Sequence, residues 1–223
     1  MSEWWTYRPD DFLLFSGEVY WRLFERTNAA LWPLPLLALA AGLAVLALMA
    51  WRSRPGMRAA ALLLALAWAV SGWGFVWLRY APINWASAYA LPLFALEALL
   101  LAGLALSGRR LGTRDGPARA IGLGLVVLAA IAVPLIAPLA GRPVLGAEIF
   151  AMAPDPTAIA TLGIAAAMQG RLRWLVATAP ILWLAASAAT LFTLGAAQAW
   201  VVAAALGAAL VGLALPTPRR GRL

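Results

Sequence analysis

The sequence contains no histidine, no cysteine and no lysine. Without the first two, the chain cannot form thiolate or imidazole metal sites, or hold haem through His or Cys. Nucleophile systems of the Ser–His–Asp or Cys–His type are excluded for the same reason. A retinal Schiff base needs a lysine, so a light-driven retinal protein is excluded as well. We therefore expect no cofactor, no metal and no catalytic residues of these common kinds.

Charged residues are also scarce, at 12% of the chain, whereas hydrophobic residues make up 64%. The apolar residues gather in blocks of about 18–23 residues, the length that a helix needs to cross a hydrocarbon core of about 30 Å. We predict an all-α polytopic membrane helix bundle with about seven transmembrane helices. The predicted spans are 29–51, 59–78, 87–107, 120–140, 156–169, 174–194 and 198–215. The chain then divides into an interfacial N-terminal segment (1–28), a seven-span domain (29–215) and a basic tail (216–223).

The fifth predicted span, 156–169, is the shortest. Its roughly 14 residues are too few for a full crossing, and the preceding segment is broken by Pro154 and Pro156. Either the helix begins earlier and is kinked, or a short re-entrant piece precedes it. Irregular backbone at membrane depth is tolerated only where it is buried in protein or lines a wet cavity.

Arginines fill every second gap between the apolar blocks. These gaps and the tail hold Arg52, Arg54, Arg58, Arg109, Arg110, Arg114, Arg119, Arg171, Arg173, Arg219, Arg220 and Arg222. The intervening gaps hold only Arg79 and Arg142. This alternation is typical of positive-inside topology, which places the N-terminus outside and the C-terminus in the cytoplasm. Because the arginines form no continuous stripe, we expect the lipid bilayer and not nucleic acid as their partner.

The alanine-rich, lysine-free composition is typical of a GC-rich bacterial genome. We therefore expect a multi-pass protein of the bacterial cytoplasmic (inner) membrane. The small residues of the span 198–215 suit close helix packing, either within the protein, which we favour, or between copies. If the chain has protein partners, we expect a second copy of itself or another membrane protein.

The N-terminal segment predicts a helix lying in the membrane interface. Pro9-Asp10-Asp11 is typical of a helix start, and from Ser16 onward apolar residues recur at helical spacing. Tryptophans near the predicted span ends support an aromatic belt: Trp32, Trp51, Trp77, Trp85, Trp174 and Trp200. Three others lie deeper and should face the bundle, because their indole N–H groups need partners: Trp68, Trp73 and Trp183.

Glu97 lies at the middle of the third span and is the candidate intramembrane polar site. A lone charged carboxylate there costs roughly 2.5–3.5 kcal/mol on insertion scales. Glu97 can be a proton or cation site, or the polar lining of a substrate cavity. Alternatively, it is a protonated residue that joins helices through a backbone carbonyl or a neighbouring hydroxyl, with these candidate partners: Ser71, Thr161 and Ser187.

Four residues form the candidate outer-side site. Asp155, between two prolines, can cap the fifth helix, and Glu148 can join it around a hard cation. Because two carboxylates are too few to identify a metal, no metal is predicted. Tyr80 and Asn84 lie in the loop between the second and third spans. That loop is either a structured turn with interfacial anchors or the rim of a cavity.

Five short motifs carry a resemblance to known proteins: Trp5-Thr6-Tyr7, Tyr20-Trp21-Arg22-Leu23-Phe24-Glu25, Asn28-Ala29-Ala30-Leu31-Trp32-Pro33, Tyr80-Ala81-Pro82-Ile83-Asn84 and Ala153-Pro154-Asp155-Pro156-Thr157. With them the chain resembles a family of small multi-pass bacterial membrane proteins of uncharacterised function. The resemblance implies the multi-pass architecture and supplies no catalytic residues. The resemblance also implies that cysteine is more frequent in the family at the position of Asp155, so any thiol chemistry of the family would not carry over to this chain.

Three functions are compatible with these patterns. Glu97, the broken fifth span and the proline-containing helices favour a transporter or channel-like protein for a small solute or ion. The scarcity of intramembrane polar groups favours instead a non-catalytic membrane subunit or assembly partner of a larger complex. A lipid-modifying enzyme is the least favoured, because its acid and base chemistry would depend on carboxylates alone. A hydrated cavity that reaches Glu97 would separate the first hypothesis from the second.

Overall fold

The computed structural model describes residues 15–51, 53–107 and 111–216. These residues form helices and turns, without any named strand, which confirms the predicted all-α class. The elements, in chain order, are α1 (Gly17–Ala30), α2 (Leu34–Trp51), α3 (Arg54–Val70), the π-helical η3 (Ser71–Tyr80), the 3₁₀ helix η4 (Trp85–Ala90), α4 (Leu91–Leu106), α5 (Pro117–Val127), the π-helical η5 (Leu128–Ala132), α6 (Val133–Leu139), the 3₁₀ helix η6 (Val144–Gly146), α7 (Pro154–Ala167), α8 (Leu172–Thr193) and α9 (Gln198–Ala214).

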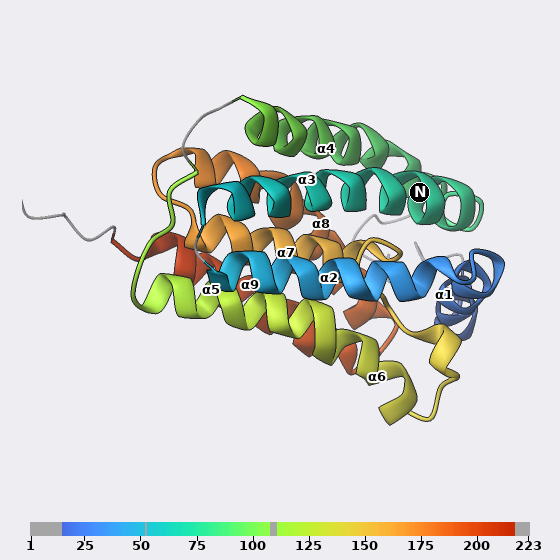
Figure 1. Cartoon of the computed structure of the whole chain (residues 1–223). Coiled ribbons are helices and arrows are strands. Elements are labelled where there is room, and N and C mark those ends of the chain that lie inside the picture. Colours follow the sequence, from blue (N-terminus) through green and yellow to red (C-terminus); the bar gives the residue numbers. More distant parts are fainter. Residues whose placement is uncertain (1–14, 52, 108–110, 217–223) are drawn as a thin grey trace, which may run out of the picture.

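The long helices run back and forth through one bundle (Figure 1). η3 continues α3, η4 leads into α4, and η5 joins α5 to α6, so each of these groups forms a single rod. α1 packs against η3 and η6 at one end of the bundle, called here the α1 end. The opposite end, called the arginine end, is where α2, α4, α7 and α9 finish and where Arg58, Arg114 and Arg119 lie.

Five helical rods are long and apolar enough to cross a membrane: Leu34–Trp51, Pro55–Tyr80, Trp85–Leu106, Pro117–Leu139 and Leu172–Thr193. Of the seven predicted spans, five therefore meet this criterion of length and hydropathy, and the spans 156–169 and 198–215 do not. α9 is apolar but has only 17 residues. α7 has 14 residues, or about 21 Å at 1.5 Å per residue, against a hydrocarbon core of about 30 Å.

α7 forms the centre of the bundle. All 14 of its residues are buried, and it packs against α3, α5, α8 and α9. Small side chains let its neighbours approach closely: a Cβ placed on Gly163 would lie 2.6 Å from the carbonyl oxygen of Gly122 in α5. A helix enclosed by protein on all sides does not need the full length of a lipid-exposed span.

The segment before α7 is not an earlier, kinked start of the helix, which was one of the two predicted alternatives. Residues 147–150 are buried without forming a helix, and α7 begins only at Pro154. Asn28 of α1 holds this segment, since its Nδ2 donates to the carbonyl oxygens of Leu145 (2.6 Å) and Ala147 (2.8 Å). Irregular backbone is thus enclosed by protein, as burial away from water requires.

Three arginines at the arginine end bind the exposed carbonyl groups of helix C-termini. Arg58 donates to Ala105 of α4 (2.7 Å), and Arg119 donates to Ala50 of α2 (3.0 Å). Arg114 is 1% exposed and binds the C-terminal ends of α7 and α9 through the carbonyl oxygens of Ala166, Gly212, Leu215 and Pro216. Carbonyls in the last turn lack helical partners and carry partial negative charge. These arginines therefore stabilise helix ends, whatever their part in topology.

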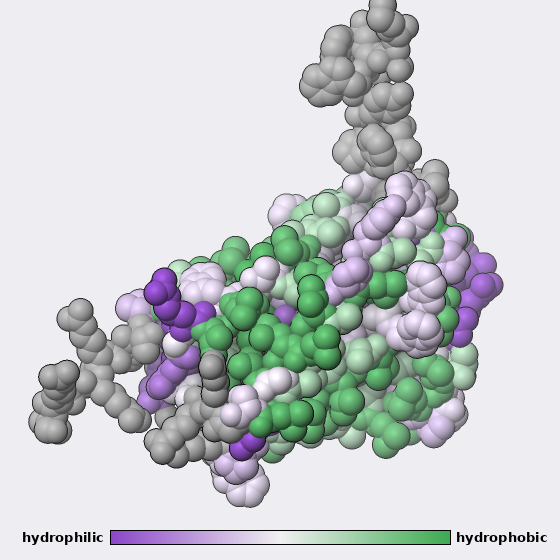
Figure 2. All heavy atoms as spheres, turned by 90° about the horizontal axis from the view of Figure 1, so that it is seen from above, coloured by the Kyte–Doolittle hydropathy of each residue, from purple (hydrophilic) through white to green (hydrophobic). Residues whose placement is uncertain are grey.

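The tryptophans largely follow the predicted belt. The six expected near span ends are exposed, between 43% and 81%. Apolar side chains cover the middle of the bundle in Figure 2, with hydrophilic residues toward its ends. Trp68 and Trp183 are buried and donate hydrogen bonds. Trp73 differs from the prediction: it is 64% exposed and stacks on Trp77, because the π-helical turn presents it on the outer surface.

The predicted amphipathic helix from Ser16 is confirmed as α1. The side chain of Ser16 accepts a hydrogen bond from the amide of Val19 (3.4 Å) and caps the helix. α1 buries Tyr20 and Phe24 against the bundle. The predicted helix start at Pro9-Asp10-Asp11 lies outside the described residues.

Candidate functional site

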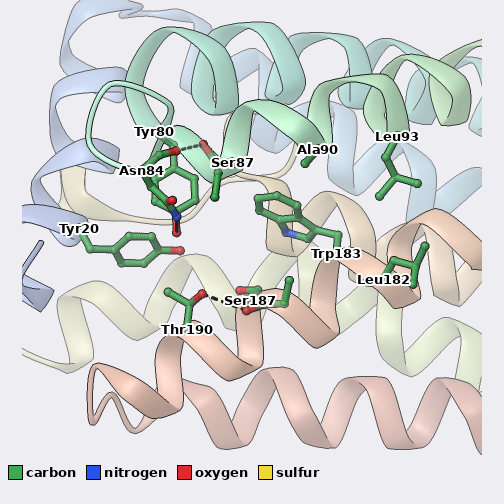
Figure 3. A pocket seen from close by; sticks show the side chains of 12 residues that line it. Tyr20, Tyr80, Asn84, Ser87, Ala90, Leu93, Leu182, Trp183, Ser187 and Thr190 are labelled. Atoms are coloured by element: carbon green, nitrogen blue, oxygen red, sulfur yellow. Dashed lines mark hydrogen bonds between the residues drawn. The ribbon is translucent and has the colours of Figure 1, made fainter. Parts of the chain in front are cut away.

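A pocket of about 310 Å³ opens between η4–α4 and α8, near the α1 end. This volume lies at the lower end of the range for small-molecule sites. Figure 3 shows polar side chains gathered on one side of the pocket and Leu93 and Leu182 on the other. The lining residues are Tyr20, Tyr80, Asn84, Ala86, Ser87, Ala90, Leu93, Leu182, Trp183, Ala186, Ser187 and Thr190.

The structure brings the predicted residues Tyr80 and Asn84 together at this pocket. Asn84 Nδ2 donates to the hydroxyl of Tyr80 (3.0 Å), and the backbone carbonyl of Asn84 accepts from the hydroxyl of Ser87 (2.8 Å). These bonds stabilise the turn between η3 and η4. They also hold the Asn84 amide and the hydroxyl groups of Tyr80 and Ser87 at the wall of the cavity. The loop is therefore both a structured turn and the rim of a cavity, the two alternatives that the sequence left open.

Tyr20 closes the α1 side of the pocket. It was not identified as a site residue from the sequence. Its ring packs against Tyr80 at a centroid distance of 5.8 Å, and its hydroxyl points into the cavity (Figure 3). Tyr20 is only 5% exposed and belongs to the pocket lining. Burial, reinforced by the nearby carboxylates of Asp155 and Glu148, raises the pKa of Tyr20 well above its ordinary value. Tyr20 therefore presents a neutral hydroxyl to whatever enters the pocket.

Asp155 lies beneath the pocket. Trp183 Nε1 donates to its Oδ1 (2.7 Å), and Ser187 Oγ donates to its Oδ2 (2.6 Å). Both donors belong to α8 and line the pocket. Both oxygens of this 3% exposed carboxyl group therefore accept a hydrogen bond from α8. Trp183 and Ser187 are four residues apart and so share one helix face, a spacing that could have indicated a paired site on α8.

The cap predicted for Asp155 is wrong. α7 begins at Pro154 with Ala153 as its N-cap, and no side chain caps it. Thr157 instead stabilises the backbone at the start of α7. Its hydroxyl accepts from the amide of Ala151 (3.0 Å) and donates to the carbonyl of Ala153 (2.9 Å). Asp155 is thus free to bind α8.

Glu148 lies beside Asp155, and the two carboxylates border the same small cavity of about 10 Å³. Glu148 Oε1 accepts from Gln198 Nε2 (2.7 Å), and Gln198 Oε1 accepts from Arg142 Nη2 (2.7 Å). The guanidinium of Arg142 lies 3.9 Å above the ring of Trp21. Burial, and then the charge of Asp155, raise the pKa of Glu148 to about 8, against the opposing effects of Arg142 and Gln198. Burial and the proximity of the two acids therefore favour a pair that retains a proton.

The pair does not form a complete cation site. Among the described residues, no three Asp, Glu, His or Cys side chains come together. Hard cations such as Ca²⁺ take about six to eight oxygen ligands, and a cavity of about 10 Å³ leaves little room for added water. The hard-cation alternative for Glu148 and Asp155 therefore has no further support.

Glu97 is buried but separate from this site. It is 2% exposed, and its Oε1 has no partner among the described residues. The pocket reaches Leu93, one turn earlier on α4, and does not include Glu97 in its lining. The cavity at Glu97 that was expected to distinguish a transporter from a membrane subunit is therefore not seen in the described part of the chain, and any transport hypothesis depends on the pocket itself. The three hydroxyls predicted as its partners bond elsewhere, to Ala67, Thr157 and Asp155: they are Ser71, Thr161 and Ser187.

Comparison with known proteins places the chain in a family without assigning a role. No curated protein and no solved structure matches it. The model of a family of unknown function, DUF6064, matches residues 17–221. This match spans most of the chain, including α1 and every helix that borders the pocket. The chain belongs to this family of unknown function.

Proposed function

We propose that the protein is a multi-pass membrane transporter that takes a small molecule into the pocket between α4 and α8. One observation carries the proposal: the pocket rests on a buried carboxylate. Two of its lining residues, Trp183 and Ser187, hydrogen-bond to Asp155, which lies beside the buried Glu148. A binding cavity joined directly to a pair of buried acids is the arrangement that proton-linked transport requires.

The proposed topology has seven crossings, with α7 and α9 as short crossings inside the bundle. The arginine end lies in the cytoplasm, because it collects the positively charged gaps. The α1 end and the pocket near it then face outward, and the membrane is the bacterial cytoplasmic (inner) membrane. The exposed tryptophans at both ends of the bundle support this placement.

The carboxylate pair gives the pocket a way to exchange a proton. A ligand that hydrogen-bonds Ser187 or Trp183 competes with Asp155 for the same donor. Losing a donor makes the Asp155 carboxylate a stronger base. A proton then moves toward Asp155 from Glu148 or from the pocket, so ligand occupancy and protonation are linked.

The test compares transport by two adjacent alanine variants in reconstituted vesicles. Ala186 lines the pocket, whereas Ala185 is exposed on α8 and does not. Vesicles of phosphatidylethanolamine and phosphatidylglycerol hold a panel of sugars, amino acids, glycerol, fatty alcohols and monoacylglycerols. Mass spectrometry follows the loss of soluble members, and albumin extraction follows movement of the amphipathic members between leaflets.

We expect wild type and Ala185→Trp to move at least one member of the panel faster than protein-free vesicles. Ala186→Trp should abolish that movement, because the indole occupies the pocket. Movement that survives Ala186→Trp would place the route elsewhere and overturn the proposal. If no member moves, transport is rejected in favour of a membrane subunit.

A further inference from the structure

The pocket has two chemically different ends. Along α8, the lining runs from Thr190 near the α1 end to Leu182 toward the middle of the bundle, eight residues or about 12 Å apart. The α1 side offers hydroxyl and amide groups: Tyr20, Tyr80, Asn84, Ser87, Ser187 and Thr190. The deeper side offers Ala90, Leu93, Leu182 and the ring of Trp183 (Figure 3). A ligand that satisfies both ends must itself be amphipathic.

The polar end is suited to an uncharged group. None of the lining residues, all within the described part of the chain, is Arg, Lys, Asp or Glu. The oxygens of Asp155 behind the wall already accept from Trp183 and Ser187. A phosphate or carboxylate would find no cation there and would lose its hydration. The neutral hydroxyl of Tyr20 points into the pocket and is instead suited to exchange a hydrogen bond with a ligand hydroxyl.

The pocket opens on the flank of the bundle. Ala86, Leu182 and Ala186 are exposed at its edge. α4 lies on the outside of the bundle (Figure 1), and the surface seen from that side is apolar over its middle (Figure 2). In a bilayer this flank meets lipid, so an amphipathic ligand can enter sideways from the membrane with its polar group near the surface.

We infer that the pocket binds an uncharged, hydroxyl-bearing, single-chain amphiphile of the monoacylglycerol or long-chain alcohol type. Its polar group lies beside Tyr20, Asn84 and Ser187, and its chain passes between Leu93 and Leu182 toward the middle of the bilayer. The inference depends on the proposed function for the location of the site, and it does not require that the ligand is moved.

The test measures equilibrium binding of radiolabelled 1-monooleoylglycerol to the full-length protein in lipid nanodiscs. Two competitors separate the parts of the ligand: oleate keeps the chain with an anionic head, and glycerol keeps the head alone. We expect oleate to bind at least roughly tenfold more weakly, because its charge is unpaired in the pocket. Glycerol should not displace the label.

Matched variants locate the binding. Tyr20→Phe should weaken binding about fivefold, the usual effect of one neutral hydrogen bond. Tyr89→Phe should have no effect, because Tyr89 is 76% exposed and outside the pocket. Leu93→Trp should block the chain, whereas Leu96→Trp, at a 65% exposed position on the same helix, should not.

Each result that would contradict the inference contradicts a different part of it. Equal binding of oleate overturns the uncharged head, and displacement by glycerol overturns the amphiphile. Binding that is indifferent to both Tyr20→Phe and Leu93→Trp overturns the pocket as the ligand site. Binding as expected without any movement in the vesicle assay overturns transport and leaves the ligand class standing.

Discussion

Replacing Gly122 by alanine tests whether α7 is the closely packed centre of the bundle. A Cβ at this position would lie 2.4 Å from the carbonyl oxygen of Gly163 and 2.9 Å from Met49 Cε. The methionine can move aside, but the carbonyl belongs to the backbone of a fully buried helix. Gly124, two residues along the same helix α5, has open space where its Cβ would be. The two positions therefore form a matched pair.

Comparing the free energies of unfolding of the two variants removes the contribution of helix propensity and leaves the steric cost. Both substitutions gain the same helix propensity, about 1 kcal/mol for Gly to Ala. Only Gly122→Ala incurs the steric cost of overpacking, typically about 1–3 kcal/mol. Gly122→Ala should therefore be less stable than Gly124→Ala by about 1–3 kcal/mol, and near the upper value because backbone must shift.

Unfolding of the purified protein in mixed micelles by sodium dodecyl sulfate, followed by circular dichroism, measures this difference. Equal midpoints for the two variants would refute close packing of α5 on α7. A Gly122→Ala variant more stable than Gly124→Ala would refute it more strongly.

Two further predictions concern the charged residues. Arg114→Lys should lower the free energy of unfolding by about 2–4 kcal/mol, because an ammonium cannot reach carbonyls on two helices at once. The control Arg171→Lys, at an exposed position, should change the free energy of unfolding little. Equal effects of the two substitutions would contradict the capping role of Arg114. Glu148 has a pKa of about 8 in the folded protein against an ordinary value of 4.5, so the folded state holds more protons between these values. Stability should then fall as pH rises from about 4.5 to about 8, by at most about 1.4 kcal/mol per pH unit. Glu148→Gln should flatten this slope, and an unchanged slope in that variant would contradict the raised pKa of Glu148.

Helix positions could be predicted closely where apolar blocks begin or end near tryptophan or proline. The predicted span 174–194 corresponds to α8 at Leu172–Thr193, and the span 198–215 corresponds to α9 at Gln198–Ala214. The short fifth span could not be interpreted correctly from its length alone. Its complete burial depends on the neighbours that surround it, and hydropathy along one segment carries no information about them.

The candidate site was predictable only in part. Asp155, Glu148, Tyr80 and Asn84 were conspicuous as polar residues among apolar ones, and all four lie at or beneath the pocket. Their partners come from distant helices and have side chains that also suit an interface or a core. The most distant in sequence are Tyr20 of α1 and Gln198 of α9. Long-range packing brings these residues together, and local periodicity does not record it.

Glu97 shows the same limit of prediction from the sequence. A carboxylate at mid-span is costly in lipid, which makes it conspicuous in any sequence. In the folded chain it is enclosed by the bundle at 2% exposure, one turn beyond the pocket. The position of Glu97 within an apolar helix could be predicted from sequence, whereas membership of a cavity could not.

The central claim is that the pocket between α4 and α8 is the ligand site. Because the chain has no cysteine, a single thiol at position 186 or 185 reports on one location without background. The most direct measurement is the alkylation rate of Ala186→Cys and Ala185→Cys in nanodiscs, with and without 1-monooleoylglycerol. The account predicts that the ligand slows alkylation at position 186 several-fold and leaves position 185 unchanged. Equal rates with and without ligand at position 186, or equal protection at both positions, would contradict it.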